Sequence, residues 1–158
     1  MPTIRPARPV EAVELTALCL RSKAHWGYDA AFMRQSRAAL TVTEAMISSG
    51  RVLVTETAAG RLAGVAAVAR LDECGRFVLS LMFVDPAAIR AGIGRALFKV
   101  AVRLAASAGG TSLTILADPF AEAFYRRLGA VRIGEAPSDA IPGRMVPLLE
   151  YTINESRS

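Results

Sequence analysis

The chain has 158 residues, 53% of them hydrophobic, which is the size and composition of one globular domain, residues 1–158. Its formal charge of +5 comes mostly from arginines dispersed along the chain, without the dense basic stripe of a nucleic-acid-binding protein. No uncharged apolar run approaches the ~20 residues that span a bilayer, and one histidine with two scattered cysteines cannot supply a four-ligand zinc site, so neither a membrane partner nor a metal is expected.

The first third of the chain predicts a short strand followed by a helix. The segment "TIRPAR" has the pattern of an opening strand. A helix is then expected from Pro9 to about Ala24, with Gly27 as its terminator. The apolar residues that recur there at helical spacing, and so predict its buried face, are Val10, Val13, Ala17 and Leu20.

Two further helices are expected before the sheet continues. The segment "DAAFMRQSRAAL" predicts a second helix with Asp29 as its N-cap. Thr41 and Glu44 have the spacing of a capping box, which predicts a short helix that stops near Gly50.

The middle of the chain predicts an antiparallel meander. Three β-rich runs, "RVLVTET", "RLAGVAAVARL" and "RFVLSLMFVD", are separated by turn signals. An amphipathic helix, 92–107, follows, then a strand at 112–117, a helix at 121–128 and a last strand at 148–153. A strand, a helix of this length and another strand imply a parallel crossover. The fold class is therefore mixed α/β, with helices on both faces of the sheet.

The stretch "RAGIGRA" at the start of the long helix predicts an anion site. A helix N-terminus presents unpaired N–H groups, and Gly92 and Gly94 let the backbone approach a phosphate. Arg90 and Arg95 add positive charge. The lysine–hydroxyl pair of a P-loop is missing, and so are the third glycine and the acidic residue of a dinucleotide fingerprint. The alternative is that both glycines only form a tight turn.

Around this turn the chain resembles the GNAT superfamily of acetyl-CoA-dependent N-acetyltransferases. The family's pyrophosphate loop reads Arg/Gln-x-x-Gly-x-Gly/Ala after a strand that ends in Val-x-Pro, here Val84 to Pro86. Ile89 stands at the first position of the loop, and Arg90 is displaced by one residue. The resemblance implies acetyl-CoA as co-substrate, and a sheet of six to seven mostly antiparallel strands. The residues it implies for coenzyme binding at this turn are Arg90, Ala91, Gly92, Ile93, Gly94, Arg95 and Ala96.

A second motif, "DPFAEAFYRRLGA", carries the same resemblance. It is similar to the family's Asn-x-x-Ala-x-x-Phe-Tyr-x-x-x-Gly-Phe block, with Asp118 in place of the asparagine and Ala130 in place of the last aromatic residue. By analogy Asp118 and Tyr125 contact the coenzyme, and Tyr125 protonates the leaving thiolate as general acid. The alternative is that Phe124 and Tyr125 are core residues of an amphipathic helix and that Asp118 is an N-cap.

The family polarises the thioester carbonyl with backbone N–H groups of its splayed fourth strand, which implies Met82, Phe83 and Val84 here. Preorganised donors of this kind commonly provide the largest catalytic effect. GNAT enzymes often place a glutamate base on that strand, but "FVLSLMFV" has none, and Ser80 could only orient a water. A base must come from elsewhere.

The segment "KAHWGYDAAFM" holds the only histidine and the only tryptophan of the chain. In the family, the loop between the first two helices closes over the acceptor. His25 is a candidate base because histidine is the side chain that ordinarily exchanges a proton near neutral pH. Trp26 and Tyr28 could wall the acceptor site, and Asp29 could hold an ammonium group. The alternatives are that His25 bonds a helix end, that Trp26 packs into the core and that Asp29 is only an N-cap.

The loop "PSDAIPGRMVP", between the last two strands, is a second candidate for the acceptor side. Its prolines and glycine make it stiff, and Arg144 could clamp a carboxylate. The alternative is a solvated arginine beside a hairpin.

These patterns predict a cytoplasmic N-acetyltransferase that transfers acetyl from acetyl-CoA directly to a primary amine in a ternary complex. The acceptor is a small molecule or a peptide, and neither Cys19 nor Cys74 resembles a ping-pong nucleophile. Two alternatives stay open: a non-catalytic coenzyme A-binding module and a basic nucleic-acid-binding domain. Dimers through the last strands are common in such folds, so a homodimer is one expected assembly.

Overall fold

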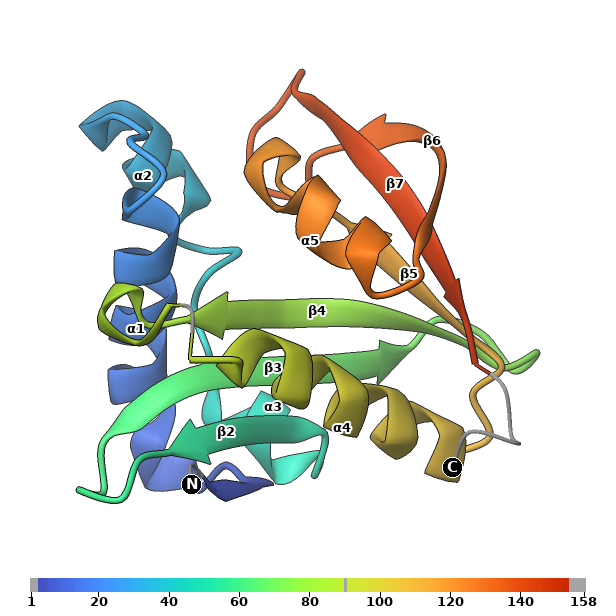
Figure 1. Ribbon diagram of the computed structural model, residues 1–158. Coiled ribbons are helices and arrows are strands. Elements are labelled where there is room, and N and C mark those ends of the chain that lie inside the picture. Colours follow the sequence, from blue (N-terminus) through green and yellow to red (C-terminus); the bar gives the residue numbers. More distant parts are fainter. Residues whose placement is uncertain (1–2, 90, 154–158) are drawn as a thin grey trace.

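In the computed structural model, which describes residues 3–89 and 91–153, seven strands form one mixed sheet in the order β1-β2-β3-β4-β5-β7-β6 (Figure 1). β4 and β5 pair in parallel, and the other neighbours pair antiparallel. The strands are β1 (Thr3–Pro6), β2 (Val52–Glu56), β3 (Leu62–Arg70), β4 (Arg76–Val84), β5 (Ser112–Leu116), β6 (Val131–Pro137) and β7 (Met145–Thr152). The predicted fold class, meander and parallel crossover are confirmed.

Five α-helices connect and cover these strands. They are α1 (Ala12–Ala24), α2 (Ala30–Ser36), α3 (Glu44–Ser48), α4 (Ile93–Ser107) and α5 (Glu122–Arg127). Short 3₁₀ turns precede three segments of the chain: η1 (Pro9–Glu11) before α1, η2 (Pro86–Ala88) before the glycine turn, and η3 (Pro119–Ala121) before α5. No helix within the described ranges is both long and apolar enough to cross a membrane.

Two apolar cores lie on opposite faces of the sheet because neighbouring residues of a strand point to opposite sides. On β2, Leu53 packs with α4 and α5, whereas Val54 packs with α1 and α3. The α4 face is the larger core; its helix contributes Ile93, Leu97, Phe98, Ala101 and Ala105. The prediction of helices on both faces is therefore confirmed.

The sheet opens between β4 and β5. Their parallel pairing covers only Arg76 to Val78 on β4 and Ser112 to Thr114 on β5. Figure 1 shows the two strands close together at their N-terminal ends and diverging toward their C-terminal ends. In the same region of β4 the register against β3 shifts, because Leu81 pairs with Ala67 and Leu79 pairs with Val68. Ser80 is the extra residue of this bulge, a feature that often lies beside active sites.

Two local predictions were wrong. Val10 and Val13 were expected on the buried face of the first helix, but they are 86% and 84% exposed. The buried face of α1 instead holds a second stripe at helical spacing, which lies on the other side of the helix because Val13 and Leu15 are about 200° apart around its axis. This stripe consists of Ala12, Leu15, Leu18 and Cys19. The N-cap of α3 is Thr43, whose hydroxyl accepts from the Met46 N–H at 3.1 Å; Thr41 instead bonds the Arg37 carbonyl.

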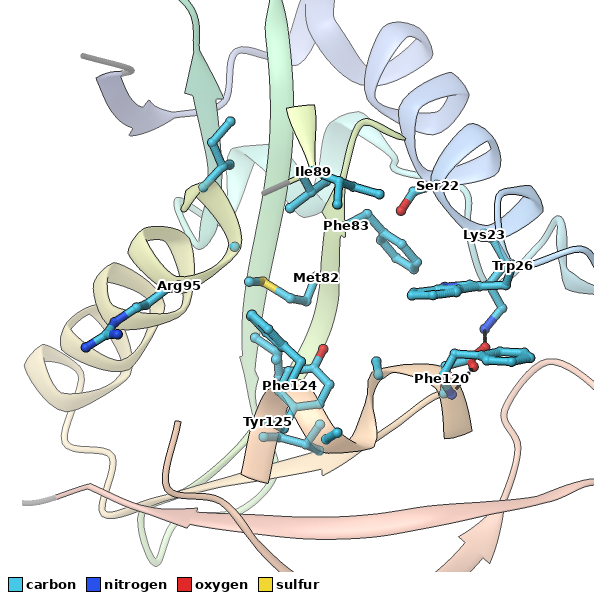
Figure 2. A pocket seen from close by; sticks show the side chains of 18 of the residues that line it. Ser22, Lys23, Trp26, Met82, Phe83, Ile89, Arg95, Phe120, Phe124 and Tyr125 are labelled. Carbon is cyan, nitrogen blue, oxygen red and sulfur yellow. Dashed lines mark hydrogen bonds and ion pairs between the residues drawn. The ribbon is translucent and has the colours of Figure 1, made fainter. Parts of the chain in front are cut away.

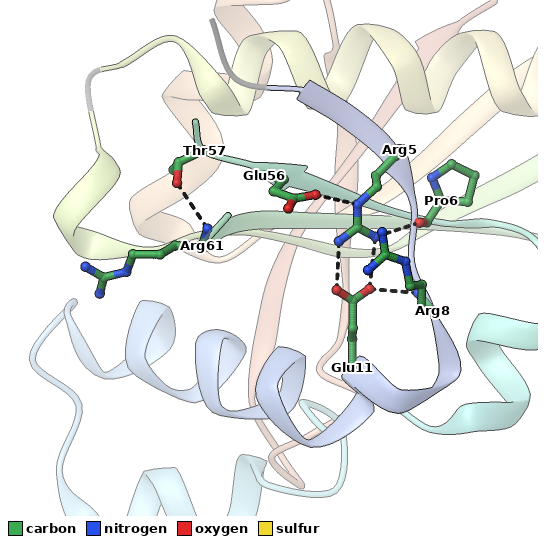
Figure 3. A network of polar contacts seen from close by, with 7 residues as sticks. All are labelled: Arg5, Pro6, Arg8, Glu11, Glu56, Thr57 and Arg61. Carbon is green, nitrogen blue, oxygen red and sulfur yellow. Dashed lines mark hydrogen bonds and ion pairs between the residues drawn. The ribbon is translucent and has the colours of Figure 1, made fainter. Parts of the chain in front are cut away.

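A network of charged side chains connects β1 and η1 with β2 (Figure 3). The Arg5 guanidinium donates to both carboxylate oxygens of Glu11, at 3.0 and 2.8 Å, and to Glu56 at 2.7 Å. Glu11 also accepts from the Arg8 N–H at 2.8 Å. The Arg5 side chain is only 17% exposed. A bidentate, largely buried pair of this kind is worth more than a solvated surface pair.

Replacing Arg5 with methionine should lower the free energy of unfolding by about 1–3 kcal/mol, because it leaves two carboxylates without their cation. The hydrogen bond from Arg5 holds the pKa of Glu11 below its usual value. A depressed carboxyl pKa stabilises the fold above the unfolded-state pKa, and that stability is lost as the pH falls. Urea unfolding as a function of pH should therefore show a steeper acid loss in the parent than in the variant. The matched control is Arg61→Met, because Figure 3 shows the Arg61 side chain pointing away from Glu11 and Glu56.

Candidate active site

A cavity of about 520 Å³ occupies the opening between β4 and β5. Figure 2 shows that it extends from the first turn of α4, which carries Arg95, to Lys23 near the C-terminal end of α1 and Trp26 just beyond it. The β4 wall consists of Leu79, Ser80, Met82, Phe83 and Val84, and the β5 wall of Ile115 and Leu116. The predicted residues Met82, Phe83 and Val84 thus lie together along the cavity.

The glycine turn closes one end of the cavity. Gly92 is the N-cap of α4 and has φ = 76°, a left-handed conformation that favours glycine. No heavy atom lies within 4 Å of the position of a Cβ on Gly92, so the turn faces open space. The first intrahelical bond of α4 runs from the Ala96 N–H to the Gly92 carbonyl at 3.2 Å. The N–H groups of Ile93, Gly94 and Arg95 precede that bond and have no acceptor within the helix.

The turn departs from its predicted role at several positions. The Ala91 N–H donates to the Ala88 carbonyl at 3.3 Å, and the Ala96 N–H is used inside α4, so neither amide is free for a ligand. A Cβ on Gly94 would lie 3.1 Å from the Phe124 ring, so this glycine is required by helix packing as well. Ile89 lines the cavity. The predicted ligand Arg90 lies outside the described residues.

Tyr125 lies opposite the glycine turn on α5. It is 6% exposed and packs against Phe98 and Phe124, with ring centroids 6.1 and 5.2 Å away. The residue lines the cavity, and Figure 2 shows its hydroxyl directed toward Met82. Burial, together with the charge of Asp118, raises the pKa of the phenol well above its usual value. Tyr125 therefore stays protonated near neutral pH and can act as a proton donor.

Two stacked aromatic rings border the opposite end of the cavity. Trp26, 38% exposed, lies parallel to Phe120 with ring centroids 5.3 Å apart. Both residues line the cavity (Figure 2). His25, the predicted base, caps the exposed C-terminal end of α1 and does not line it. Asp29 accepts from the Phe32 N–H at 2.8 Å and is the N-cap of α2. Of the predicted segment, only Trp26 and Lys23 reach this cavity.

Asp118 is the centre of an ion cluster. One of its carboxylate oxygens accepts from the Lys23 ammonium at 2.5 Å and from the Tyr28 hydroxyl at 2.8 Å; the other accepts from the Phe120 N–H at 2.9 Å. Burial alone would raise the pKa of Asp118, but the hydrogen bonds from Lys23 and Phe120 outweigh it, and the pKa lies below its usual value. Asp118 is thus a carboxylate that orders its neighbours as well as an N-cap.

Tyr28 and Arg144, 116 positions apart in the sequence, meet at this cluster. The Arg144 guanidinium donates to the Tyr28 hydroxyl at 2.8 Å. Because a guanidinium can only donate and a carboxylate can only accept, the phenol proton must point to Asp118. The structure therefore brings together two of the residues predicted for the acceptor side.

A second cavity, about 220 Å³, adjoins the first. Lys23, Leu79, Ser80, Phe83, Leu116 and Asp118 line both cavities. The second cavity is completed by the end of α2, at Ser36, by the loop before β7, at Asp139 and Arg144, and by the apolar residues Leu40 and Val146. The Ser80 hydroxyl donates to the Ala67 carbonyl at 3.2 Å. Of the residues predicted for the acceptor side, Ser80 therefore lines both cavities and Arg144 lines the second.

Comparisons with known proteins identify the family and the fold of this chain. The sequence matches the acetyltransferase (GNAT) domain over residues 19–140, and the chain belongs to this family. A GCN5-related N-acetyltransferase from Rhodopseudomonas palustris superposes with a TM-score of 0.74 at 22% identity, over 96% of each chain. The Salmonella typhimurium protein yncA, described with its cofactor acetyl-CoA, superposes with a TM-score of 0.71 at 21% identity, over 98% of this chain and 95% of that one.

An aminoglycoside 6'-N-acetyltransferase in complex with coenzyme A has a TM-score of 0.72 and 17% identity, over 96% of this chain and 97% of that one. At these identities the likeness concerns the fold. No match to the sequence was found among curated proteins.

Sequence reasoning missed Lys23 and Ser36 as site residues. A signal for Lys23 was present, since it is one of only two lysines in a chain whose 19 basic residues are otherwise arginines. Ser36 gave no signal, because a serine in a short helix is ordinary.

Proposed function

We propose that this GNAT family member is an N-acetyltransferase that moves the acetyl group of acetyl-CoA directly to a primary amine in a ternary complex. The observation that carries the proposal is the meeting of two cavities at the opening between β4 and β5. A donor in the first cavity and an acceptor in the second would meet beside Ser80. Structural neighbours described with acetyl-CoA and with coenzyme A support the choice of donor.

The residues of the first cavity are suited to coenzyme A. The N–H groups of Ile93, Gly94 and Arg95 would hold its pyrophosphate, since a helix N-terminus favours anions. The apolar walls, Met82 and Val84 on one side and Ile115 on the other, would cover the less polar arm. When bound, the coenzyme supplies an activated acetyl thioester.

The proposed transfer replaces the carbon–sulfur bond of the thioester with a carbon–nitrogen bond. The acceptor nitrogen forms a bond to the acetyl carbonyl carbon, the carbon–sulfur bond breaks, and the sulfur takes a proton while the nitrogen loses one. Backbone N–H groups of β4 beyond Val78, which β5 does not pair, would stabilise the carbonyl oxygen. Tyr125 would give its proton to the sulfur, and the proton lost by the amine would pass to solvent and restore the phenol.

The decisive experiment is the release of free thiol from acetyl-CoA by the purified protein with a panel of primary amines. Amine-dependent release, with an acetylated amine found by mass spectrometry, is the expected result. Binding of coenzyme A with no release for any amine would favour the non-catalytic module, an alternative suggested by the absence of an acidic side chain on β4.

Trp26 provides a direct report on binding, because it is the only tryptophan of the chain. Acetyl-CoA should change its fluorescence emission, since the half-exposed indole borders the first cavity. An acceptor amine should change the emission again at saturating coenzyme. Titration of the Phe120→Ala variant is the control, because it removes the stacked partner and should shift the starting emission without abolishing the response. If neither ligand changes the Trp26 emission, the ligands bind away from the end of α1.

A further inference from the structure

The chemical class of the acceptor can be read from the second cavity. We infer that the acceptor carries a carboxylate beside its amine, as an amino acid does, and that Arg144 binds this carboxylate. The inference rests on the proposed function and deepens it. Three independent features of the second cavity carry it: the way Arg144 is held, the balance of charge around Asp118, and the buried hydroxyl of Ser36.

Arg144 is fixed in place while most of its donors stay free. Its guanidinium carbon lies 4.9 Å from the centre of the Phe32 ring and 5.3 Å from that of Tyr28, and the side chain is only 21% exposed. Of its five N–H donors, one is accounted for within the described residues, in the bond to the Tyr28 hydroxyl. A guanidinium that is stacked and preorganised in this way is suited to bidentate recognition of a carboxylate.

Among the residues described, the nearest counter-ion of Arg144 is Asp118, and Arg144 shares it with Lys23. Asp118 is neutralised by Lys23 at 2.5 Å, whereas the Arg144 nitrogen lies 3.9 Å from the same oxygen, outside hydrogen-bond distance. Asp139 also lines this cavity, but it is exposed, so solvent screens its charge. Two cations thus share one buried carboxylate, and an anionic group on the ligand would restore the balance.

Ser36 adds a polar group that the protein does not satisfy. It is 1% exposed, it lines the second cavity, and its hydroxyl has no hydrogen-bond partner in the structure as described. Most buried hydroxyl groups are hydrogen-bonded, because leaving one unpaired is costly. A polar atom of the acceptor would supply the missing partner.

The size and the apolar wall of the second cavity narrow the class further. A volume of about 220 Å³ is below the ~300 Å³ at which pockets for drug-sized ligands begin. Leu40, Leu79 and Val146 offer an apolar surface to a side chain. With its carboxylate at Arg144, a small amino acid could direct its amine to the shared wall at Ser80.

The test compares L-amino acids with matched compounds that lack the carboxylate. Each amino acid is assayed beside its α-carboxamide and its decarboxylated amine, for example L-leucine, L-leucinamide and isoamylamine. Assays at two pH values separate the effect of the carboxylate from its effect on the pKa of the amine. We expect kcat/KM to favour at least one amino acid over both of its partners by about tenfold or more, the range of a hydrogen bond to a charged group.

Two variants assign the preference to residues. Arg144→Gln should raise KM for the preferred amino acid by about 10- to 100-fold, with little effect on its decarboxylated amine. The matched control is Arg34→Gln, because Arg34 is an exposed arginine on α2. This variant should change the KM of neither the amino acid nor its decarboxylated amine. Ser36→Ala should also raise the amino-acid KM, yet leave the melting temperature equal or higher because it removes an unpaired buried hydroxyl.

Equilibrium binding separates failure of this inference from failure of the proposed function. Calorimetric titration of the same compounds is done without acetyl-CoA and again with coenzyme A present. If amines are acetylated but no amino acid is preferred, the carboxylate inference is overturned and the proposed function stands. If no amine is acetylated, yet amino acids bind and Arg144→Gln weakens that binding, the carboxylate site stands and the transfer does not. If amino acids neither react nor bind better than their amides, the inference is wrong.

Discussion

Replacing Tyr125 with phenylalanine is expected to lower kcat by about 10²–10⁴-fold, the usual contribution of a positioned general acid. The Kd for coenzyme A should stay within about twofold, because the phenol proton is needed only when the sulfur leaves. Stability should hardly change. The ring keeps its packing against Phe98 and Phe124, and no hydrogen bond of the hydroxyl is present among the described residues that the change would break.

The pH dependence adds a second expectation for Tyr125. Because burial raises the pKa of this phenol, the acid stays protonated throughout a neutral to mildly alkaline range. The parent should therefore show no alkaline loss of kcat from this group in that range. Since the acid is already missing in the variant, raising the pH should not change the ratio of the two rates there.

Tyr151→Phe is the matched control for this measurement. Tyr151 packs edge-on against Phe98 with centroids 5.2 Å apart, but it lines neither cavity. It should keep full kcat. If Tyr125→Phe loses stability or raises KM while kcat is retained, Tyr125 is a core residue and the proton must come from elsewhere.

Much of the fold followed from local patterns. The meander, the long helix and the parallel crossover depend on runs of β-branched residues, turn signals and helical spacing, all of which act over a few residues. The buried face of α1 was not predicted correctly from these patterns. Val10 and Val13 share a helical stripe with Ala17, but a second stripe at the same spacing, with Leu15 and Leu18, covers the sheet instead. Both stripes recur at helical spacing, so periodicity alone did not decide which of them is buried.

The half of the site proposed for the coenzyme was easier to predict than the half proposed for the acceptor. A glycine turn at the start of a helix and a tyrosine on the following helix are local motifs, and the structure places Gly92 and Tyr125 around one cavity. The proposed acceptor side depends on contacts between distant segments. Lys23 and Asp118 are 95 positions apart, and Tyr28 and Arg144 are 116 apart. No local pattern encodes such pairs, so the sequence could nominate Tyr28 and Arg144 but could not join them.

The glycine turn provides the other large expected effect. Gly92→Asp should weaken the binding of coenzyme A by about 100-fold more than Gly92→Asn does. The two side chains have the same shape, and both tolerate the left-handed conformation of Gly92 better than most residues. They differ by one negative charge in the open space before the helix N-terminus. At about 6 Å and an effective dielectric constant of about 20, repulsion between that charge and a phosphate costs ~3 kcal/mol, which is about 100-fold in Kd.

Calorimetric titration with coenzyme A at two salt concentrations tests this comparison. Raising the ionic strength should narrow the gap between the two variants, because salt screens the repulsion at an exposed turn. Pantetheine, which has no phosphate, should bind both variants equally. The same Kd for coenzyme A in Gly92→Asp and Gly92→Asn would mean that the phosphates lie away from the start of α4, and that Gly92 is present only because the backbone there requires a positive φ.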